Sequence, residues 1–427
     1  MESEPRQIAI IGAGYVGLSA AVCLSYMGNI VRCSDLNHER VSLLATGKSP
    51  IYETGLEELL GAGIDSGNLS FGTDNLWAVE LADLVFLCLP TPQGPEGRAD
   101  VSRVEEVARE IGPHLRSGCI VVNKSTVPVG SARMVQRAVG RRDVAVASNP
   151  EFLREGSAIQ DFLHPDRIVI GADDEHVAMR VASLYMQLGA PLVVTDPATA
   201  ETIKYASNAF LATKVSFVNA LAALCEAIGA DMASVVRGMG FDPRIGGAYL
   251  QPGPGWGGSC FPKDTAALVR LGDDAGYDFS LLRGAIAVNE QQHGRVLEKT
   301  VRLAGGSVLD ARVAIWGLTF KAGTDDLRYS PALELAGRLR ELGAKVAVYD
   351  PTVSGELDGL EVAPDPYAAA TGAVVTVVAT EWDEFRWLDF NKVGEIVARR
   401  AIVDARNLLD RDALRRAGFA YEGIGVR

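Results

Sequence analysis

The stretch Ile8-Ala9-Ile10-Ile11-Gly12-Ala13-Gly14-Tyr15-Val16-Gly17 (residues 8–17) decides the fold. A short apolar strand runs directly into a Gly-x-Gly-x-x-Gly turn, and an apolar helix follows the turn. Gly12 permits the tight turn, Gly14 lets a pyrophosphate approach the backbone, and Gly17 brings the helix against the strand. The pyrophosphate would lie on the N–H groups at the start of the helix. The stretch therefore predicts the first unit of a dinucleotide-binding Rossmann domain.

Asp35 ends the next predicted strand, 30–34, as this kind of site requires. Its carboxylate can accept hydrogen bonds from both ribose hydroxyls, and its charge would repel a 2′-phosphate, which favours NAD over NADP. The alternative is a structural glycine turn followed by an unrelated surface aspartate. Besides the glycines and Asp35, we expect the cofactor to be lined by Tyr15, Val16, Arg40, Pro90, Thr91 and Thr126.

The pattern along the chain predicts an α/β protein with two doubly wound Rossmann-like domains, joined by a long central helix and a helical connector. Short apolar runs separated by helical periods are typical of a parallel sheet covered on both faces. Up to about residue 195 the clearest predicted strands are 8–11, 30–34, 84–89, 119–123, 144–147 and 167–170. Apolar residues then recur at helical spacing over 199–228.

We expect an NAD-binding domain over 1–198 and a helical connector with the catalytic loop over 199–305. A second Rossmann-like domain, which binds the nucleotide sugar, is expected over 306–427. It begins with a strand–helix–strand pattern over 313–349.

The composition excludes several classes of partner. The formal net charge is −13, from 54 acidic and 41 basic residues, which argues against nucleic acid and anionic membranes as partners. No run of ~18 apolar residues or signal peptide is evident, so we expect no membrane association. The 6 cysteines have no metal-ligand spacing, which indicates no metal site and is typical of a reducing cytoplasm.

Cys260 lies at the end of a glycine-rich loop, Gly253-Pro254-Gly255-Trp256-Gly257-Gly258-Ser259. Exposed backbone N–H groups and a cysteine outside any strand make Cys260 a candidate nucleophile, whose thiolate a helix N-terminus would favour. Asp264 reaches the same face if a helix begins near Pro262. The alternative is an inert packing cysteine.

Two further pairs of polar residues are spaced four apart. Lys204 and Asn208 share one face of the predicted long helix, which would suit two donors aimed at one developing alkoxide; the alternative is a solvated helix face. Glu151 and Glu155 share a face if their segment is helical. Thr126 follows a predicted strand and could offer its hydroxyl to the cofactor or to a catalytic water, although such segments are often ordinary turns.

Together these segments resemble the UDP-glucose/GDP-mannose dehydrogenase family over essentially the whole chain. The resemblance rests on the Lys204/Asn208 pair and on GAGYVG (12–17), LPTP (89–92), KSTVPVG (124–130), NPEFLREG (149–156), RIG (244–246), GWGGSCFPKD (255–264), GLTFKAGTDDLRYSP (317–331) and DARN (404–407). Trp256 and Tyr249 stand where phenylalanines are usual in the family.

The resemblance implies an oxidation of a nucleotide sugar, with NAD, from primary alcohol to carboxylate through a thioester on Cys260. Lys204 and Asn208 would stabilise oxyanions, and Asp264, with Thr126 and Glu151, would activate water. Glu155 and Arg328 would touch NAD. The resemblance further implies that the substrate is held by Glu151, Phe152, Leu153, Glu155, Lys204, Asn208, Tyr249, Leu250, Gly257, Phe320, Lys321 and Arg406, and by Arg244 of a neighbouring subunit in a homodimer or higher oligomer.

UDP-glucose is the substrate that these motifs favour. GDP-mannose and TDP-glucose stay open as alternatives. Uridine and thymidine differ by one methyl, which is worth only about 1 kcal/mol in a pocket. A two-electron hydroxyacid dehydrogenase shares the Rossmann domain and the long helix but requires neither Cys260 nor the residues after 306. A non-catalytic nucleotide-sugar sensor would be expected to have lost Cys260, Lys204 or Asp264.

Overall fold

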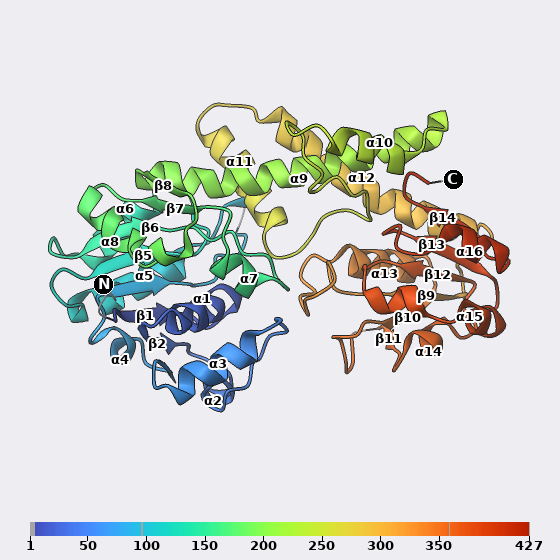
Figure 1. Cartoon of the computed structure of the whole chain (residues 1–427). Coiled ribbons are helices and arrows are strands. Elements are labelled where there is room, and N and C mark those ends of the chain that lie inside the picture. The colour runs from blue at the N-terminus through green and yellow to red at the C-terminus, as the bar shows by residue number, and fades with distance from the viewer. Residues whose placement is uncertain (1–4, 95–96, 358, 427) are drawn as a thin grey trace. The chain divides into compact units, whose positions relative to one another are not determined.

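The computed structural model describes residues 5–94, 97–357 and 359–426, and Figure 1 shows its elements. Packing divides the chain into two compact units, residues 1–207 and 208–427. Each unit contains one mostly parallel sheet with helices on its faces. The long helix α9 (Pro197–Ile228) begins in the first unit and ends in the second.

The sheet of the first unit has the strand order β3-β2-β1-β4-β5-β6-β7-β8, and β1 lies at the centre of a doubly wound arrangement. All pairings are parallel except that of β6 with β7. Its strands are β1 (Gln7–Ile11), β2 (Ile30–Ser34), β3 (Leu69–Gly72), β4 (Leu84–Leu87), β5 (Ile120–Asn123), β6 (Ala145–Ser148), β7 (Ile168–Gly171) and β8 (Leu192–Thr195). Its helices are α1 (Tyr15–Tyr26), α2 (His38–Ala45), α3 (Leu56–Asp65), α4 (Asn75–Val79), α5 (Ser102–Ile111), η2 (Gly112–His114), α6 (Ser131–Val139), α7 (Ala158–Leu163), α8 (Glu175–Ala182) and η3 (Met186–Leu188).

The second unit contains three further helices before its sheet. The strand order of the sheet is β11-β10-β9-β12-β13-β14, and all of its strand pairings are parallel. The helices before the sheet are α10 (Met232–Gly240), α11 (Phe261–Asp274) and α12 (Ser280–Leu303). The sheet region comprises β9 (Arg312–Trp316), α13 (Pro331–Glu341), β10 (Lys345–Tyr349), β11 (Glu361–Val362), α14 (Pro366–Ala370), β12 (Val375–Val378), η4 (Asp383–Trp387), α15 (Phe390–Ile396), β13 (Ala401–Asp404), α16 (Arg411–Arg416) and β14 (Ala420–Gly423). Two Rossmann-type sheets and a long helix between them confirm the predicted fold class.

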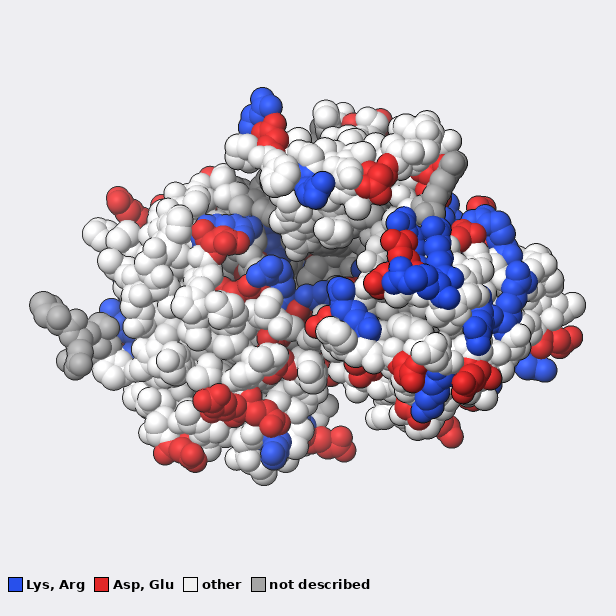
Figure 2. Space-filling model, turned by 45° about the vertical axis from the view of Figure 1, so that its right-hand side comes forward, with Lys and Arg blue, Asp and Glu red and all other residues white. Residues whose placement is uncertain are grey.

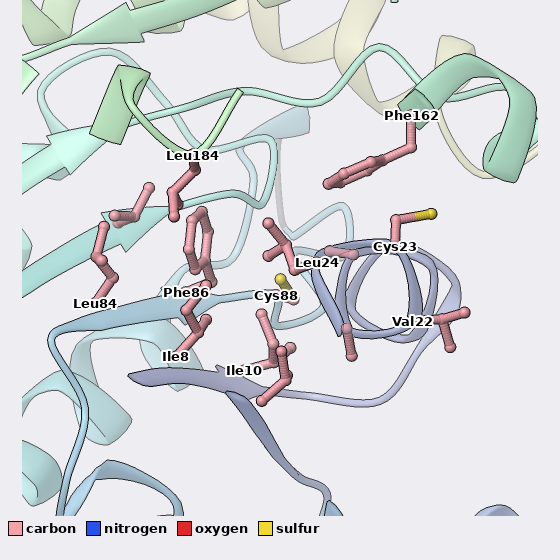
Figure 3. Close-up of a cluster of buried hydrophobic side chains, with 14 of the residues drawn as sticks. Ile8, Ile10, Val22, Cys23, Leu24, Leu84, Phe86, Cys88, Phe162 and Leu184 are labelled. Carbon is pink, nitrogen blue, oxygen red and sulfur yellow. The ribbon is translucent and has the colours of Figure 1, made fainter. Parts of the chain in front are cut away.

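One face of the first sheet is packed against α1 and α7. Figure 3 shows Ile8, Ile10 and Phe86 of β1 and β4 meeting Leu24 of α1 and Phe162 of α7. All five side chains are buried. This apolar packing holds β1 and α1 rigidly together, and the Gly12–Gly17 turn between them is held with them.

Several buried residues of α9 are polar or charged, which the sequence pattern did not indicate. Its buried residues include Lys204, Asn208, Ser216 and Asn219. By length and composition α9 could cross a membrane, contrary to the expectation that no segment would. Inside each unit, however, these polar side chains bond to loops and helices of the folded chain, as Ser216 does to the Ala285 carbonyl at 2.6 Å.

The two sheets begin with the same turn construction. The Gly12 N–H donates to the Ser34 carbonyl at 2.7 Å, and the Gly317 N–H donates to the Tyr349 carbonyl at 2.7 Å. Both glycines have a positive φ, 99° and 87°, which L-residues with side chains rarely adopt. Each sheet therefore carries a tight turn after its first strand.

Acidic and basic side chains lie among one another on the surface. On the face in Figure 2 basic side chains gather toward the right-hand side, and acidic side chains lie beside them. Many form ion pairs, such as Arg302 with Glu422 and Arg312 with Glu361. The net negative charge of the chain is thus spread over a mixed surface.

Candidate active site

The Gly12–Gly17 turn has the geometry that a pyrophosphate needs. A Cβ at Gly12 would lie 2.5 Å from the Cys88 carbonyl oxygen, and one at Gly17 would lie 1.8 Å from the Gly12 oxygen. Around Gly14 no atom would lie within 4 Å of such a Cβ, so its backbone is open to a ligand. Gly14 is also the N-cap of α1 and provides no side-chain cap for the first N–H groups. The turn therefore fits the pyrophosphate of NAD.

Asp35 stands at the end of β2 beside this turn. Its carboxylate accepts hydrogen bonds from the Ala13 N–H at 2.9 Å and from the Arg40 guanidinium at 3.1 Å, and a third from the Asn37 N–H. A carboxylate offers about four acceptor positions, so Asp35 retains capacity for a ribose hydroxyl. Arg40 thus forms an ion pair with Asp35, and both remain candidates for the cofactor site.

Cofactor preference is expected to depend on Asp35. The wild type should use NAD with NADP at least about tenfold worse in kcat/KM, because Asp35 repels a 2′-phosphate. Asp35→Asn removes that charge and leaves Arg40 without its carboxylate partner, so NADP should gain on NAD. Steady-state kinetics with both cofactors measure this, and Asp83→Asn, at the other end of the sheet strands, is the control. Equal use of the two cofactors by the wild type would contradict the assignment.

Tyr15 and Thr91 are structural supports as well as cofactor-site candidates. The Gly156 N–H donates to the Tyr15 hydroxyl at 2.6 Å, and that hydroxyl also contacts Glu53. The buried Thr91 hydroxyl donates to the Thr126 carbonyl at 2.8 Å. These bonds tie the loop after β4 to the loop after β5, and the loop after β6 to the start of α1. The carboxyl ends of these strands thus form one edge, where ligands bind in such folds.

Lys204 is buried and forms an ion pair with Glu151. Its Nζ lies 2.9 Å from Glu151 Oε1, and the two side chains are 4% and 6% exposed. This burial excludes the solvated-face interpretation of Lys204. Burial by itself would raise the pKa of Glu151, but the charge and hydrogen bond of Lys204, with the Leu153 N–H and the charge of Lys124, outweigh burial and leave that pKa lowered. Glu151 is therefore held as a carboxylate.

The segment containing Glu151 and Glu155 is not helical. Residues 149–154 have no regular structure, a turn follows, and α7 begins only at Ala158. Pro150 cannot donate a backbone hydrogen bond, and the Glu151 carboxylate accepts the Leu153 N–H at 2.6 Å, which favours a local turn over a helix. The conditional prediction of a shared helical face for the two glutamates is therefore wrong. Phe152 instead contacts Arg167 and Lys204 with its ring.

Lys124 is a residue of this cluster that the sequence pattern did not single out. Its buried ammonium donates to Asn149 Oδ1 at 3.0 Å and lies over the rings of Phe162 and Tyr185. Burial lowers the pKa of Lys124 to about 8, although the charges of Cys88 and Glu151 oppose that shift. Only its place directly after β5, in KSTVPVG, could have drawn attention to it.

The stability of the protein should show the titration of Lys124. Because its pKa falls from 10.5 unfolded to about 8 folded, only the unfolded chain holds this proton between these values. The contribution of Lys124 to the unfolding free energy therefore rises with pH above about 8, by about 1 kcal/mol per pH unit. Urea unfolding at pH 8, 9 and 10 should show that the unfolding free energy of the wild type increases relative to that of Lys124→Met. Lys48 is exposed, so the difference in unfolding free energy between wild type and Lys48→Met should not change with pH. A pH-independent difference between wild type and Lys124→Met would contradict the prediction.

Cys260 is the N-cap residue of α11 in the second unit. A thiolate there faces the positive end of the helix dipole, which favours its ionised form. The Asp264 N–H donates to the Cys260 carbonyl at 3.0 Å, so Asp264 lies in the first turn of α11, directly after Cys260, as predicted. Cys260 is half-buried, whereas the other cysteines are buried, which distinguishes it from packing cysteines.

The Asp264 carboxylate is buried and held from two sides. Asn208 Nδ2 donates to one oxygen at 2.6 Å, and Lys263 Nζ donates to the other at 2.6 Å. Asn208 was predicted to act on the substrate oxygen with Lys204, but its amide is bonded to Asp264 in this structure. Lys263 is a second residue whose contribution the sequence pattern did not indicate. Together they position one carboxylate a single helical turn from Cys260, the candidate nucleophile.

The glycine loop before Cys260 requires its glycines. A Cβ at Gly257 would lie 1.9 Å from the Tyr329 carbonyl oxygen, and one at Gly258 would lie 2.9 Å from the ring of Phe320. Trp256 is anchored by its backbone N–H to Asn289 and by its indole N–H to Ser216, both at 2.8 Å. The loop is thus fixed to α9, to α12 and to the segment after β9.

The second unit brings several predicted substrate residues together around this loop. Arg406 donates to the carbonyls of Phe320 and Ala379, at 2.7 and 2.8 Å, and passes close to Gly253. Tyr249 has a positive φ and contacts the ring of Phe261. Leu250 is buried and Lys321 lies beside Phe320. An aromatic ring, a guanidinium and open backbone are the groups that a base and a diphosphate need.

The side chains of Arg244 and Arg328 point to local partners, although the Arg328 carbonyl accepts the Gly258 N–H of the loop at 3.1 Å. Arg244 is exposed and bonded to Asp242 of the same turn, and Arg328 is exposed and bonded to Asp326. Among the described residues, no group of three or more histidine, cysteine or acidic side chains could hold a metal ion.

Comparison with known proteins agrees with this geometry. The NAD-binding, central and UDP-binding domain models of the UDP-glucose/GDP-mannose dehydrogenase family match residues 6–189, 198–291 and 314–411. The UDP-glucose 6-dehydrogenase of Rhizobium meliloti (strain 1021) is 44% identical over 98% of this chain and 99% of its own. TuaD, a UDP-glucose 6-dehydrogenase of Bacillus subtilis (strain 168), is 40% identical over 98% and 93%. A solved UDP-glucose dehydrogenase from Pyrobaculum islandicum superposes with a TM-score of 0.92 at 39% identity, covering 100% and 99% of the two chains.

The chain belongs to the UDP-glucose/GDP-mannose dehydrogenase family. It is an NAD-dependent nucleotide-sugar 6-dehydrogenase, and NAD is its cofactor.

Proposed function

We propose that the protein oxidises UDP-glucose at C6 to the uronate, with Cys260 holding the sugar between two oxidations. The observation that carries the proposal is the half-buried Cys260 at the N-cap of α11, on a glycine loop and one turn from the buried Asp264. The sulfur would attack where backbone N–H groups and the helix dipole favour negative charge. The Lys204–Glu151 cluster is assigned to the same substrate.

The proposed reaction has three steps. The C6 hydroxyl first loses its proton and one C6–H bond breaks, which gives an aldehyde. The Cys260 sulfur then bonds to C6 as a thiohemiacetal, and loss of the second C6–H gives a thioester. Water finally adds to C6 and the C–S bond breaks, which frees the carboxylate and restores the thiol. NAD, when bound, accepts the hydrogen and electron pair of each C6–H bond, so two NAD are reduced per sugar.

The residues of the chain would manage the charges on oxygen. The Lys204 ammonium would stabilise the oxyanion of each tetrahedral species, with Asn208 one turn further along α9. Asp264 would orient and deprotonate the hydrolytic water, with the hydroxyl of Thr126 and the carboxylate of Glu151 as further contacts.

The substrate is tested by a panel of nucleotide sugars. The relatives named UDP-glucose 6-dehydrogenase, at 44% and 40% identity, support UDP-glucose. With NAD present, UDP-glucose should give two NADH per sugar and a uronate detected by mass spectrometry. GDP-mannose and TDP-glucose are the competing arms, and a higher kcat/KM with either would reject UDP-glucose. One NADH per sugar would reject the four-electron reaction.

We also propose that the protein is a homodimer in the cytoplasm, assembled through an exposed apolar face of α9. Phe210, Phe217, Leu224 and Ile228 are all exposed, and their spacing places them along one side of the helix. Phe241 after α10 is 80% exposed. Exposed apolar patches of this kind mark protein–protein contacts.

Disruption of this face should change the oligomeric state. Phe217→Glu places a charge in the centre of the patch, so light scattering should show monomers where the wild type shows dimers. Tyr277→Glu, at an exposed aromatic residue outside that helix face, should remain dimeric. If Arg244 binds substrate across the dimer, Arg244→Ala should raise KM and leave the dimer intact. A fully active wild-type monomer would refute both parts.

A further inference from the structure

A charged cavity of about 320 Å³ lies in the second unit, away from the Cys260–Asp264 pair. It is lined by α9, α12 and the segment after β14, through Ala223, Glu226, Gln292, Arg295, Glu298, Lys299, Arg302 and Ile424. Its size falls within the range of small-molecule sites. Neither the proposed mechanism nor the expected nucleotide contacts use these residues.

Among the residues that the structure describes, none forms an ion pair with Arg295, the third cation of this cavity. Its Nη1 is buried and has no hydrogen-bond partner among the described residues. The other two cations are paired: Lys299 with Glu226 at 2.9 Å, and Arg302 with Glu422. Because a buried guanidinium donor without an acceptor is unfavourable, Arg295 is poised for an acceptor that comes from outside the chain.

The remaining lining groups are suited to hydroxyls. Glu298 is exposed at the cavity and its carboxylate can accept hydrogen bonds. Glu226 receives the Gly425 N–H at 2.7 Å, so the C-terminal segment forms a fixed wall. A plain oxyanion would use Arg295 and be repelled by these two carboxylates. A molecule with both an anionic group and hydroxyls would satisfy Arg295 and the glutamates together.

We propose that this cavity binds a small hydroxylated oxyanion of the sugar-phosphate class, with its phosphate on Arg295 and a hydroxyl on Glu298. Arginine binds phosphate with paired, charge-assisted hydrogen bonds. Gln292, in the same wall, donates to the Gly253 carbonyl at 2.7 Å. Occupancy of the cavity would therefore stiffen the helix that holds the start of the catalytic loop.

Calorimetry on the full chain tests the proposal, with saturating NAD and UDP present so that the phosphate sites of the active centre are filled. Glycerol 3-phosphate should bind with one site per chain, and glycerol should not bind. Arg295→Gln should weaken that binding at least about tenfold, as expected for loss of a charge-assisted contact. Arg283→Gln, at an exposed arginine paired with Asp273 and Asp278, is the matched control and should bind normally.

Glu298→Gln separates the two halves of the proposal, and its exposed position makes it safe for folding. It should weaken glycerol 3-phosphate binding and leave inorganic phosphate unchanged or tighter. Absence of binding to the wild type, or equal binding to wild type and Arg295→Gln, would overturn the site. Inorganic phosphate that binds as tightly as glycerol 3-phosphate would overturn the role of the hydroxyl.

Discussion

Cys260→Ala is expected to give a folded protein that binds nucleotide sugar and forms essentially no acid. In the proposed reaction two hydrogens leave the same carbon without release of a reactive aldehyde, and a covalent link to Cys260 would hold that carbon at the second oxidation level. Cys260 is the half-buried cysteine at a helix N-cap, whereas the other five are buried. The variant should show, at most, slow and reversible first-step chemistry. NADH formation and uronate release, followed together, measure the effect.

A matched control makes the same chemical change elsewhere in the second unit. Cys225→Ala removes a thiol from the core around α9 and should keep acid formation at a modest cost in stability. With Asp264→Asn, hydrolysis should slow, and mass spectrometry should find a sugar adduct on the Cys260 peptide. Uronate formed by Cys260→Ala at a rate near wild type would reject the thioester, and direct oxidation of a hydrated aldehyde would replace it.

Lys204→Ala should lose about 10²–10³ in kcat, the usual effect of removing one oxyanion donor. It should also destabilise the protein, because Glu151 would remain buried at 6% exposure without its partner. Loss of one member of a buried ion pair costs about 3–5 kcal/mol. Stopped-flow rates and urea unfolding of the same preparation measure the two effects.

A double variant separates the catalytic effect of Lys204 from its structural effect. Lys204→Met with Glu151→Gln removes both charges and keeps similar volumes, so most of the stability should return while turnover remains low. If turnover recovered with stability, Lys204 would be a structural residue only.

The sequence predicted the elements that have strong local signals. The Gly12–Gly17 turn, Asp35 at the end of β2 and the start of α11 at Phe261 lie where the patterns placed them. β3, β8 and β14 were not predicted, because they are short strands at or near the sheet edges and include exposed positions. Their pairing depends on neighbouring strands more than on their own residues.

Which of the candidate site residues bond to one another could not be predicted from the sequence. The pairing of Asn208 with Asp264 and of Lys204 with Glu151 joins residues more than 50 positions apart, which no local pattern encodes. The apolar spacing over 199–228 predicted the helix correctly, but Phe210, Phe217 and Leu224 of that pattern are exposed. The apolar periodicity predicts an apolar face of the helix, but it does not identify the residues that pack against that face.

The two similar turns divide binding and architecture between two aspartates. Asp35 gives its carboxylate to three donors and is only partly covered. Asp350, in the equivalent place after β10, is 1% exposed and receives the N–H groups of Leu318 and Thr319, the Trp382 indole and Thr352. The same turn construction thus leaves the Asp35 carboxylate partly exposed and buries the Asp350 carboxylate in internal hydrogen bonds. Because the chain's own donors occupy its carboxylate, Asp350 is not available to a ribose in the way that we expect of Asp35.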